Sequence, residues 1–101
     1  MNKVNVPMSS FGESNVLILR NDQMEFDVLL VKRSDSEVTA LQMKCSHQDN
    51  SLTANKNGLF CSAHGSTFDL DGKVTKEPAL NPLKKFKTEI NNQNIIVYLK
   101  A

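Results

Sequence analysis

The clearest alternation of hydrophobic and polar positions lies near the end of the chain. Over residues 84–90, Phe86, Thr88 and Ile90 fall on one side of an extended strand, and lysines and a glutamate fall on the other. Residues 91–94 follow as three asparagines and a glutamine, and asparagine tolerates the positive φ of a tight turn. Residues 95–99 are mostly apolar again. The pattern predicts a β-hairpin over residues 84–99.

Four earlier segments also have the composition of strands. Each is rich in apolar and β-branched residues, and turn-forming residues separate them, such as Asn21-Asp22 and Ser34-Asp35-Ser36. These segments are residues 4–6, 15–19, 26–32 and 38–44. No stretch shows the spacing of an amphipathic helix. Together with the hairpin, they predict an all-β fold, a small antiparallel sandwich or barrel.

The strand pattern weakens between Cys45 and Pro82. Three of the four glycines and two of the three prolines lie in this segment, which therefore reads as rich in loops. Loops that are held between well-formed strands often carry functional residues. We expect a single domain over residues 1–101, with a loop-rich subdomain at its tip over about residues 43–83 and a base β domain from the remainder.

Composition and charge restrict the classes of function. A chain of 101 residues with a formal net charge of +1 suits one small domain and gives no reason to expect nucleic-acid binding. No apolar run approaches the roughly 20 residues that span a bilayer, and residues 1–10 lack the pattern of a signal peptide. The sequence predicts a cytoplasmic monomer. A chain trimmed of an export signal or anchor would look the same, so a periplasmic or membrane-anchored location stays open.

Both cysteines and both histidines of the chain lie within one short segment. They form two mixed pairs, Cys45 with His47 and Cys61 with His64, separated by thirteen residues. Each pair offers a thiolate and an imidazole, which suits a two-metal cluster whose two irons have different surroundings. Zinc also accepts two cysteines and two histidines, but its sites usually pair like with like along the chain. A disulfide or two inert core thiols is the third alternative.

The second pair belongs to a longer motif. Residues 61–69 read Cys-Ser-Ala-His-Gly-Ser-Thr-Phe-Asp, which resembles the C-x-x-H-G-x-x-F/Y-D signature of the Rieske [2Fe–2S] family at every specified position. Residues 78–83 resemble the stretch that leads into the proline loop of that family. The resemblance implies a Rieske-type fold that holds one [2Fe–2S] cluster. Its implied ligands are Cys45, His47, Cys61 and His64, and Ser66 is the implied hydrogen-bond donor to a bridging sulfide.

Several positions depart from the family pattern. Asp49 stands where many relatives have glycine, and Phe68 stands where many respiratory members have tyrosine. Asn50 and Ala63 lie near the positions of two further cysteines, which form a disulfide in the Rieske proteins of cytochrome bc1 and b6f complexes. These departures favour a soluble Rieske-type ferredoxin with a reduction potential below the top of the family range.

The resemblance also implies a function. Two imidazoles in place of two thiolates leave the oxidised core neutral, which eases the addition of one electron. We therefore expect an electron carrier and not an enzyme, with redox partner proteins docking at a tip formed by His47 and His64. A small electron-donor subunit of a ring-hydroxylating oxygenase system or of a respiratory complex is the alternative, and a structural zinc module is a further one.

Two other groups of residues have competing interpretations. The lysines at positions 84, 85 and 87 are either a docking site for an acidic partner or the solvated face of a strand. Asp69 and Asp71 resemble a carboxylate pair, but we expect Asp69 to anchor a turn after the second motif and Asp71 to lie in that turn. Pro78 is expected to shape a loop beside the metal site.

Overall fold

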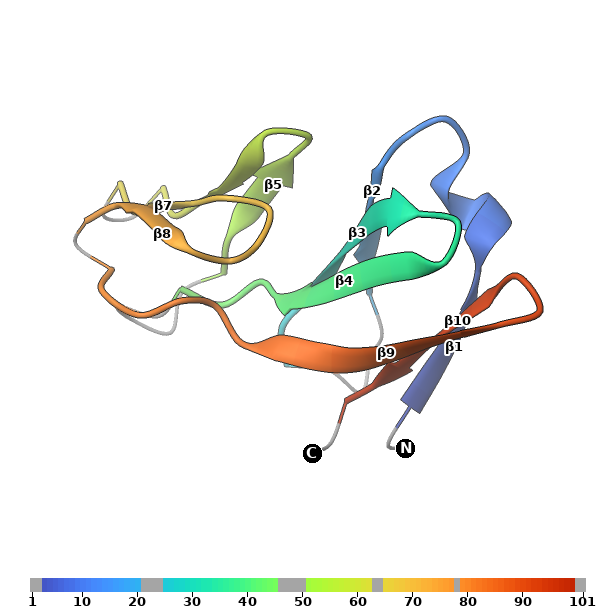
Figure 1. The fold of residues 1–101 in the computed structure, drawn as a ribbon. Helices are drawn as coiled ribbons and strands as arrows, with labels where there is room; N and C mark the ends of the chain where they lie inside the picture. The colour runs from blue at the N-terminus through green and yellow to red at the C-terminus, as the bar shows by residue number, and fades with distance from the viewer. Residues whose placement is uncertain (1–2, 21–24, 46–50, 63–64, 78, 100–101) are drawn as a thin grey trace.

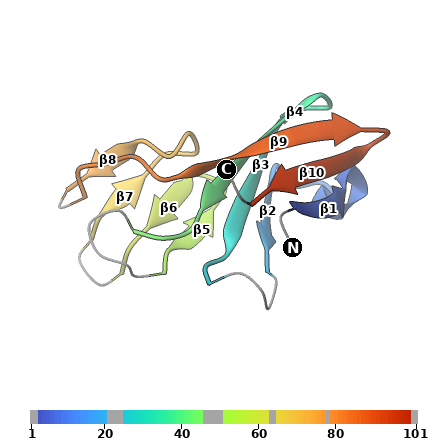
Figure 2. The ribbon, with the colours of Figure 1, turned by 90° about the horizontal axis from the view of Figure 1, so that it is seen from below.

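The structure is a computed structural model that describes residues 3–20, 25–45, 51–62, 65–77 and 79–99. Within this part of the chain, two antiparallel sheets lie beside each other along the long axis of the molecule (Figures 1 and 2). The larger sheet has six strands in the order β1-β10-β9-β4-β3-β2, and the smaller has four in the order β5-β6-β7-β8. The all-β fold predicted from the sequence is confirmed.

The strands of the large sheet come from both ends of the chain, and those of the small sheet come from its middle. The large sheet contains β1 (Lys3–Pro7), β2 (Val16–Leu19), β3 (Val28–Ser34), β4 (Glu37–Gln42), β9 (Lys85–Asn91) and β10 (Asn94–Tyr98). The small sheet contains β5 (Thr53–Asn55), β6 (Gly58–Phe60), β7 (Thr67–Phe68) and β8 (Val74–Lys76). A 3₁₀ turn, η1 (Met8–Phe11), joins β1 to β2. No helix among the described residues is long and apolar enough to cross a membrane.

The predicted C-terminal hairpin is confirmed. β9 and β10 pair in antiparallel register, with Asn94 opposite Asn91. The turn is a two-residue loop, and both of its residues have positive φ, 50° at Asn92 and 66° at Gln93. Positive φ at both central residues is typical of a type I′ turn, whose twist matches that of the two strands of a hairpin. Along β9 the exposed and half-buried residues alternate as the sequence predicts.

The strand β3 is buried on both faces. Its residues 28–31 form an uninterrupted apolar run, and each of the four is at most 2% exposed. Successive side chains of a strand point to opposite faces, so such a run needs protein on both sides. Val28 and Leu30 enter one hydrophobic core, and Leu29 and Val31 enter another. Strand β3 therefore separates the two hydrophobic cores and contributes side chains to both.

Each core has its own partners. The first is enclosed by the curled large sheet and η1, and its buried members are Val6, Phe11, Val28, Leu30, Val38, Ala40, Ile95 and Val97. The second lies between the other face of β3 and β4 and the middle of the chain. Its buried members are Leu29, Val31, Leu41, Met43, Cys45, Leu52, Leu59, Cys61, Phe68, Ala79 and Leu83. The second core thus holds the two sheets together.

The middle of the chain contains more regular structure than the sequence predicts. The segment expected to be mostly loop forms the complete four-stranded small sheet. Its strands have only two or three residues each, which is too short for a period of two to stand out. The short turn η1 was also not predicted, for the same reason of length. The expected turn at Asn21-Asp22 lies outside the described residues.

We predict that shortening either leucine at the centre of β3 destabilises the protein. Leu29→Ala and Leu30→Ala each empty a fully buried site, so each should lower the free energy of unfolding by about 2–5 kcal/mol. Urea denaturation measures the loss. Ile18→Ala on the edge strand β2 is the control, because Ile18 is 41% exposed, and it should cost about 1 kcal/mol or less.

Hydrogen exchange should separate the two core variants. Leu29 packs in the second core and Leu30 in the first. Leu29→Ala should therefore speed exchange mainly in the small sheet, and Leu30→Ala mainly in β1 and β10. The same pattern of exchange in both variants would contradict the division into two cores.

Candidate metal centre

The segment that contains Cys45 begins just beyond the end of β4. Beyond β4, Lys44 forms an isolated bridge with Ser51, and the amide of Leu52 donates to the carbonyl of Met43 at 3.2 Å. These contacts join the two ends of a loop that starts at Cys45. Within this loop, His47, Asp49 and Asn50 lie outside the described residues.

The second motif begins in the turn between β6 and β7 and continues through β7 to Asp69. Cys61 follows β6 directly, and its amide donates to the carbonyl of Ser66 at 2.8 Å. The amide of Gly65 donates back to the carbonyl of Cys61 at 2.9 Å, with Gly65 at a φ of 80° that favours glycine. The loop therefore continues the β6–β7 ladder and closes on itself. Ala63 and His64 lie outside the described residues.

The two cysteines share one dry environment. Cys45 and Cys61 are each 1% exposed, and both belong to the second core. Neither forms a disulfide, so the disulfide alternative is not what the structure shows. Sixteen positions apart in the sequence, the two thiols are thus brought into the same buried cluster by the packing of the small sheet against β3 and β4.

Among the described residues, Ser66 is the one polar residue that is buried, and it pairs with Cys61 through the backbone. It is fully buried, and its Oγ accepts a hydrogen bond from the amide of Ala79 at 3.0 Å. A hydroxyl group also has one proton to donate, and no described residue accepts it. Buried polar hydrogens are expected to have an acceptor. A sulfur atom of an iron–sulfur cluster beside Cys61 is an acceptor of the right kind, so the donor set fits a [2Fe–2S] group.

The sequence did not indicate Ala79 as a residue that holds Ser66 in place. Its backbone amide, not its side chain, carries the contact with Ser66, and a backbone amide leaves no mark in the residue pattern. The available signal was its position directly after Pro78, in the stretch that resembles the proline loop.

Pro78 itself lies outside the described residues, as do the two histidines. Among the described residues alone, no group of three or more His, Cys, Asp or Glu side chains could hold a metal ion.

Asp69 anchors the turn that follows β7, as predicted. Its Oδ1 accepts hydrogen bonds from the amides of Asp71 and Lys73, both at 2.9 Å. Gly72, at a φ of 83°, completes the turn, and its carbonyl accepts from the amide of Leu83 at 2.8 Å. The turn is thereby tied to the third loop, which runs from β8 to β9. Asp71 lies in this turn, as expected.

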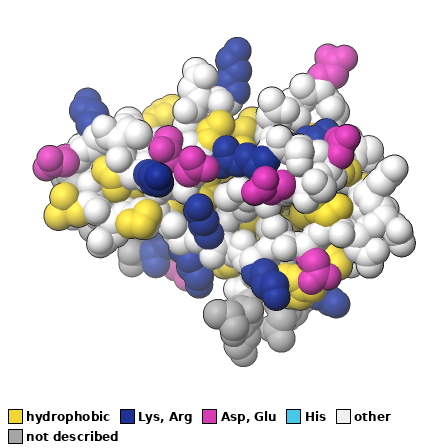
Figure 3. All heavy atoms as spheres, in the orientation of Figure 1, with side chains coloured by type: hydrophobic (Ala, Val, Ile, Leu, Met, Phe, Trp, Pro, Cys, Tyr) yellow, Lys and Arg dark blue, Asp and Glu magenta, His cyan; other side chains and the backbone are white. Residues whose placement is uncertain are grey.

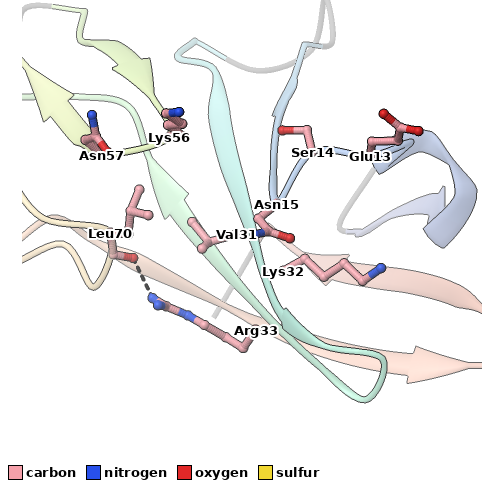
Figure 4. Close-up of a pocket in the computed structure, with 9 residues that line it drawn as sticks. All are labelled: Glu13, Ser14, Asn15, Val31, Lys32, Arg33, Lys56, Asn57 and Leu70. Atoms are coloured by element: carbon pink, nitrogen blue, oxygen red, sulfur yellow. Dashed lines mark hydrogen bonds between the residues drawn. The ribbon is translucent and has the colours of Figure 1, made fainter.

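An arginine from β3 clamps this turn to the large sheet. The Nη2 atom of Arg33 donates to the carbonyl of Leu70 and to Oδ1 of Asp71, both at 2.6 Å. Figure 4 shows the guanidinium reaching from β3 towards Leu70, beside a hollow of about 490 Å³ between the two sheets. Sequence reasoning did not single out Arg33, because its partners are 37 and 38 positions away.

The three lysines at the start of β9 and just before it lie on a surface of mixed charge. Lys84, Lys85 and Lys87 are exposed, and the Nζ atoms of Lys84 and Lys87 lie 5.2 and 5.7 Å from the ring centroids of Phe86 and Tyr98. On the face seen in Figure 3, basic and acidic side chains are interspersed. These contacts match the solvated strand face, and docking of an acidic partner there stays a prediction.

Comparison with known proteins identifies the family. The model of the Rieske [2Fe–2S] domain matches residues 8–87. The chain belongs to the Rieske [2Fe–2S] domain family. The cofactor of this domain is a [2Fe–2S] cluster, and its function is electron transfer.

The relatives of this Rieske domain include a subunit of a cytochrome complex and a plasma membrane protein. The cytochrome b6-f complex iron–sulfur subunit of Chlorobaculum thiosulfatiphilum is 31% identical over 78 residues, which are 74% of this chain and 42% of that protein. The chain thus spans less than half the length of this relative. The plasma membrane Rieske protein PetC3 of Synechocystis PCC 6803 has a TM-score of 0.77 and 28% identity, over 97% of this chain and 99% of that one.

Two further solved structures share the fold. The ferredoxin of carbazole 1,9a-dioxygenase from Nocardioides aromaticivorans IC177 has a TM-score of 0.69 at 20% identity, over 99% of this chain and 100% of that one. Naphthalene 1,2-dioxygenase has a TM-score of 0.75 at 20% identity, over 98% of this chain but only 26% of its own. The predicted Rieske-type fold is therefore confirmed.

We predict that Asp69 contributes more to stability than its neighbour Asp71. Asp69→Ala leaves two backbone amides without their acceptor and should cost about 1–3 kcal/mol. Asp71→Ala removes an ion pair whose aspartate is 55% exposed, and should cost about 1 kcal/mol or less. Thermal and urea denaturation of both variants measure the difference, and equal losses would contradict the anchoring role of Asp69.

Proposed function

We propose that this chain is a one-electron carrier of the Rieske ferredoxin type. In this proposal Cys45, His47, Cys61 and His64 hold one [2Fe–2S] cluster, within a cluster-binding part of about residues 43–83 that rests on the base β domain. The observation that carries the proposal is the pair of free, buried thiols in one core, beside a buried hydroxyl whose proton has no acceptor in the described chain.

The residues of the chain supply the setting for electron transfer. A [2Fe–2S] cluster, when bound, accepts and releases one electron. Cys45 and Cys61 would hold it from the dry side, because both are buried in the second core. His47 and His64 would complete the ligand set as neutral groups, which raises the reduction potential relative to four thiolates. Ser66 would donate to sulfur, which raises it further.

We further propose that redox partner proteins dock at a tip formed by His47 and His64. The chain aligns with the whole of the carbazole dioxygenase ferredoxin and with a quarter of naphthalene dioxygenase. An oxygenase also needs a second iron site with two further histidines and a carboxylate. The chain has two histidines, and the proposed cluster uses both.

A respiratory role is the second candidate. The observation that favours it is the 31% identity to a cytochrome b6-f iron–sulfur subunit, which exceeds the identity to the dioxygenase ferredoxin. In that role the chain would pass electrons within a larger complex. The two candidates share the same cluster and differ only in the partner protein.

We predict that each proposed ligand is needed for the cluster. Cys45→Ala, Cys61→Ala, His47→Ala and His64→Ala should each abolish acid-labile sulfide and the electron paramagnetic resonance signal of the reduced protein. Iron and sulfide assays with resonance of the purified variants measure this. The control is Ser62→Ala, because Ser62 is exposed beside Cys61 and should change neither. Stoichiometric zinc without sulfide in the wild-type protein would refute the proposal.

We predict that Phe68→Tyr raises the reduction potential. Phe68 is 2% exposed in the core that holds both cysteines, and a phenol there can donate a hydrogen bond to a thiolate. Protein-film voltammetry compares the variant with the wild type. Phe60→Tyr is the control, because Phe60 is 38% exposed and should leave the potential unchanged. An unchanged or lower potential in Phe68→Tyr would contradict the argument from hydrogen bonding to sulfur.

A further inference from the structure

The contact between Ser66 and Ala79 joins two of the three loops that surround the candidate centre. Ser66 ends the loop of the second motif, and Ala79 lies in the third loop, between β8 and β9. Both residues are fully buried, and the amide of Ala79 lies 3.0 Å from Oγ of Ser66. This is a bond from the rigid backbone of one loop to the rotatable side chain of another.

The direction of this bond decides where the proton of Ser66 can go. A hydroxyl oxygen has one proton and two lone pairs. Because the amide of Ala79 occupies one lone pair, the proton of Ser66 must point away from Ala79. No other described residue accepts it, so the proton remains available for the proposed cluster. Without the amide of Ala79, the hydroxyl would be free to rotate between its staggered positions.

The position of the Ala79 amide is itself fixed. The Ala79 side chain packs in the second core with Cys45 and Cys61. Further along the third loop, Leu83 is also buried in this core, and its amide donates to the carbonyl of Gly72 at 2.8 Å. The third loop is therefore held at two points, and its amide at position 79 is a fixed donor.

We propose that the backbone amide of Ala79 is a positioning group that orients the Ser66 hydroxyl towards the [2Fe–2S] cluster, so that the third loop sets the reduction potential. The inference rests on the proposed function, because it concerns a cluster held by Cys61 and its partners. The amide of Ala79 is not a ligand of the cluster in this scheme. It acts through Ser66, whose donated hydrogen bond raises the potential.

Proline substitutions test this directly in the cluster-loaded protein. Ala79→Pro removes the amide proton and should lower the midpoint potential in voltammetry, in the same direction as Ser66→Ala. Leu80→Pro makes the same chemical change one position later. Leu80 is 77% exposed and its amide makes no hydrogen bond within the described chain, so its potential should equal that of the wild type.

The double variant separates positioning from general damage. If Ala79 acts only through Ser66, the potential of Ser66→Ala with Ala79→Pro should equal that of Ser66→Ala alone. Additive shifts would overturn the proposal, and so would an Ala79→Pro protein that retains its cluster at the wild-type potential. Exchangeable-proton couplings in electron–nuclear double resonance should change in Ala79→Pro and stay constant in Leu80→Pro.

A second measurement covers the case in which Ala79→Pro does not fold. In Ser66→Ala the amide of Ala79 loses its acceptor, so its hydrogen exchange should accelerate severalfold while exchange in β9 stays constant. Unchanged exchange at Ala79 would overturn the proposal. A wild-type protein without the resonance signal of a reduced [2Fe–2S] cluster would instead refute the proposed function, so the two failures are distinguishable.

Discussion

Burial of β3 on both faces is the constraint on which the rest of the structure depends. The curled large sheet covers Val28 and Leu30, but it leaves Leu29 and Val31 on its outer face. An apolar outer face of this size needs a second layer of protein. The small sheet and its loops are that layer. The segment that carries the cysteines is therefore held against the large sheet by the hydrophobic effect, before any metal is considered.

The same interface explains how the two cysteines reach one dry site. Leu41, Met43 and Cys45 follow each other at intervals of two, and all three enter the second core. Leu59 and Cys61 repeat this spacing at the end of β6. Each cysteine thus continues the inward-facing alternation of the strand before it. Each loop starts at its cysteine, so the direction of the preceding strand places the thiol.

The sequence predicts some of this organisation and not the rest, for physical reasons. The hairpin of β9 and β10 is predictable because long alternation and asparagines in the turn are local signals. The segment from Cys61 to Asp69 can be recognised in the sequence because the family signature consists of fixed residue types at fixed spacing. The small sheet is not predictable, because its strands have two or three residues and form through tertiary packing. The sequence also does not predict the role of the Ala79 amide, because it is a backbone group, or the partners of Arg33, because they are distant in sequence.

The loops around the candidate centre are joined without a covalent bond of the protein. The chain has two cysteines, and both are free, so no disulfide links the loops. Single hydrogen bonds join these segments instead, from Ala79 to Ser66 and from Leu83 to Gly72. Each contributes about 1 kcal/mol to stability. A disulfide would contribute about 2–4 kcal/mol. Under the proposed ligation, metal–ligand bonds to Cys45 and Cys61 would supply the missing cross-link between the first two loops, so a bound cofactor would add to the stability that the second core already provides.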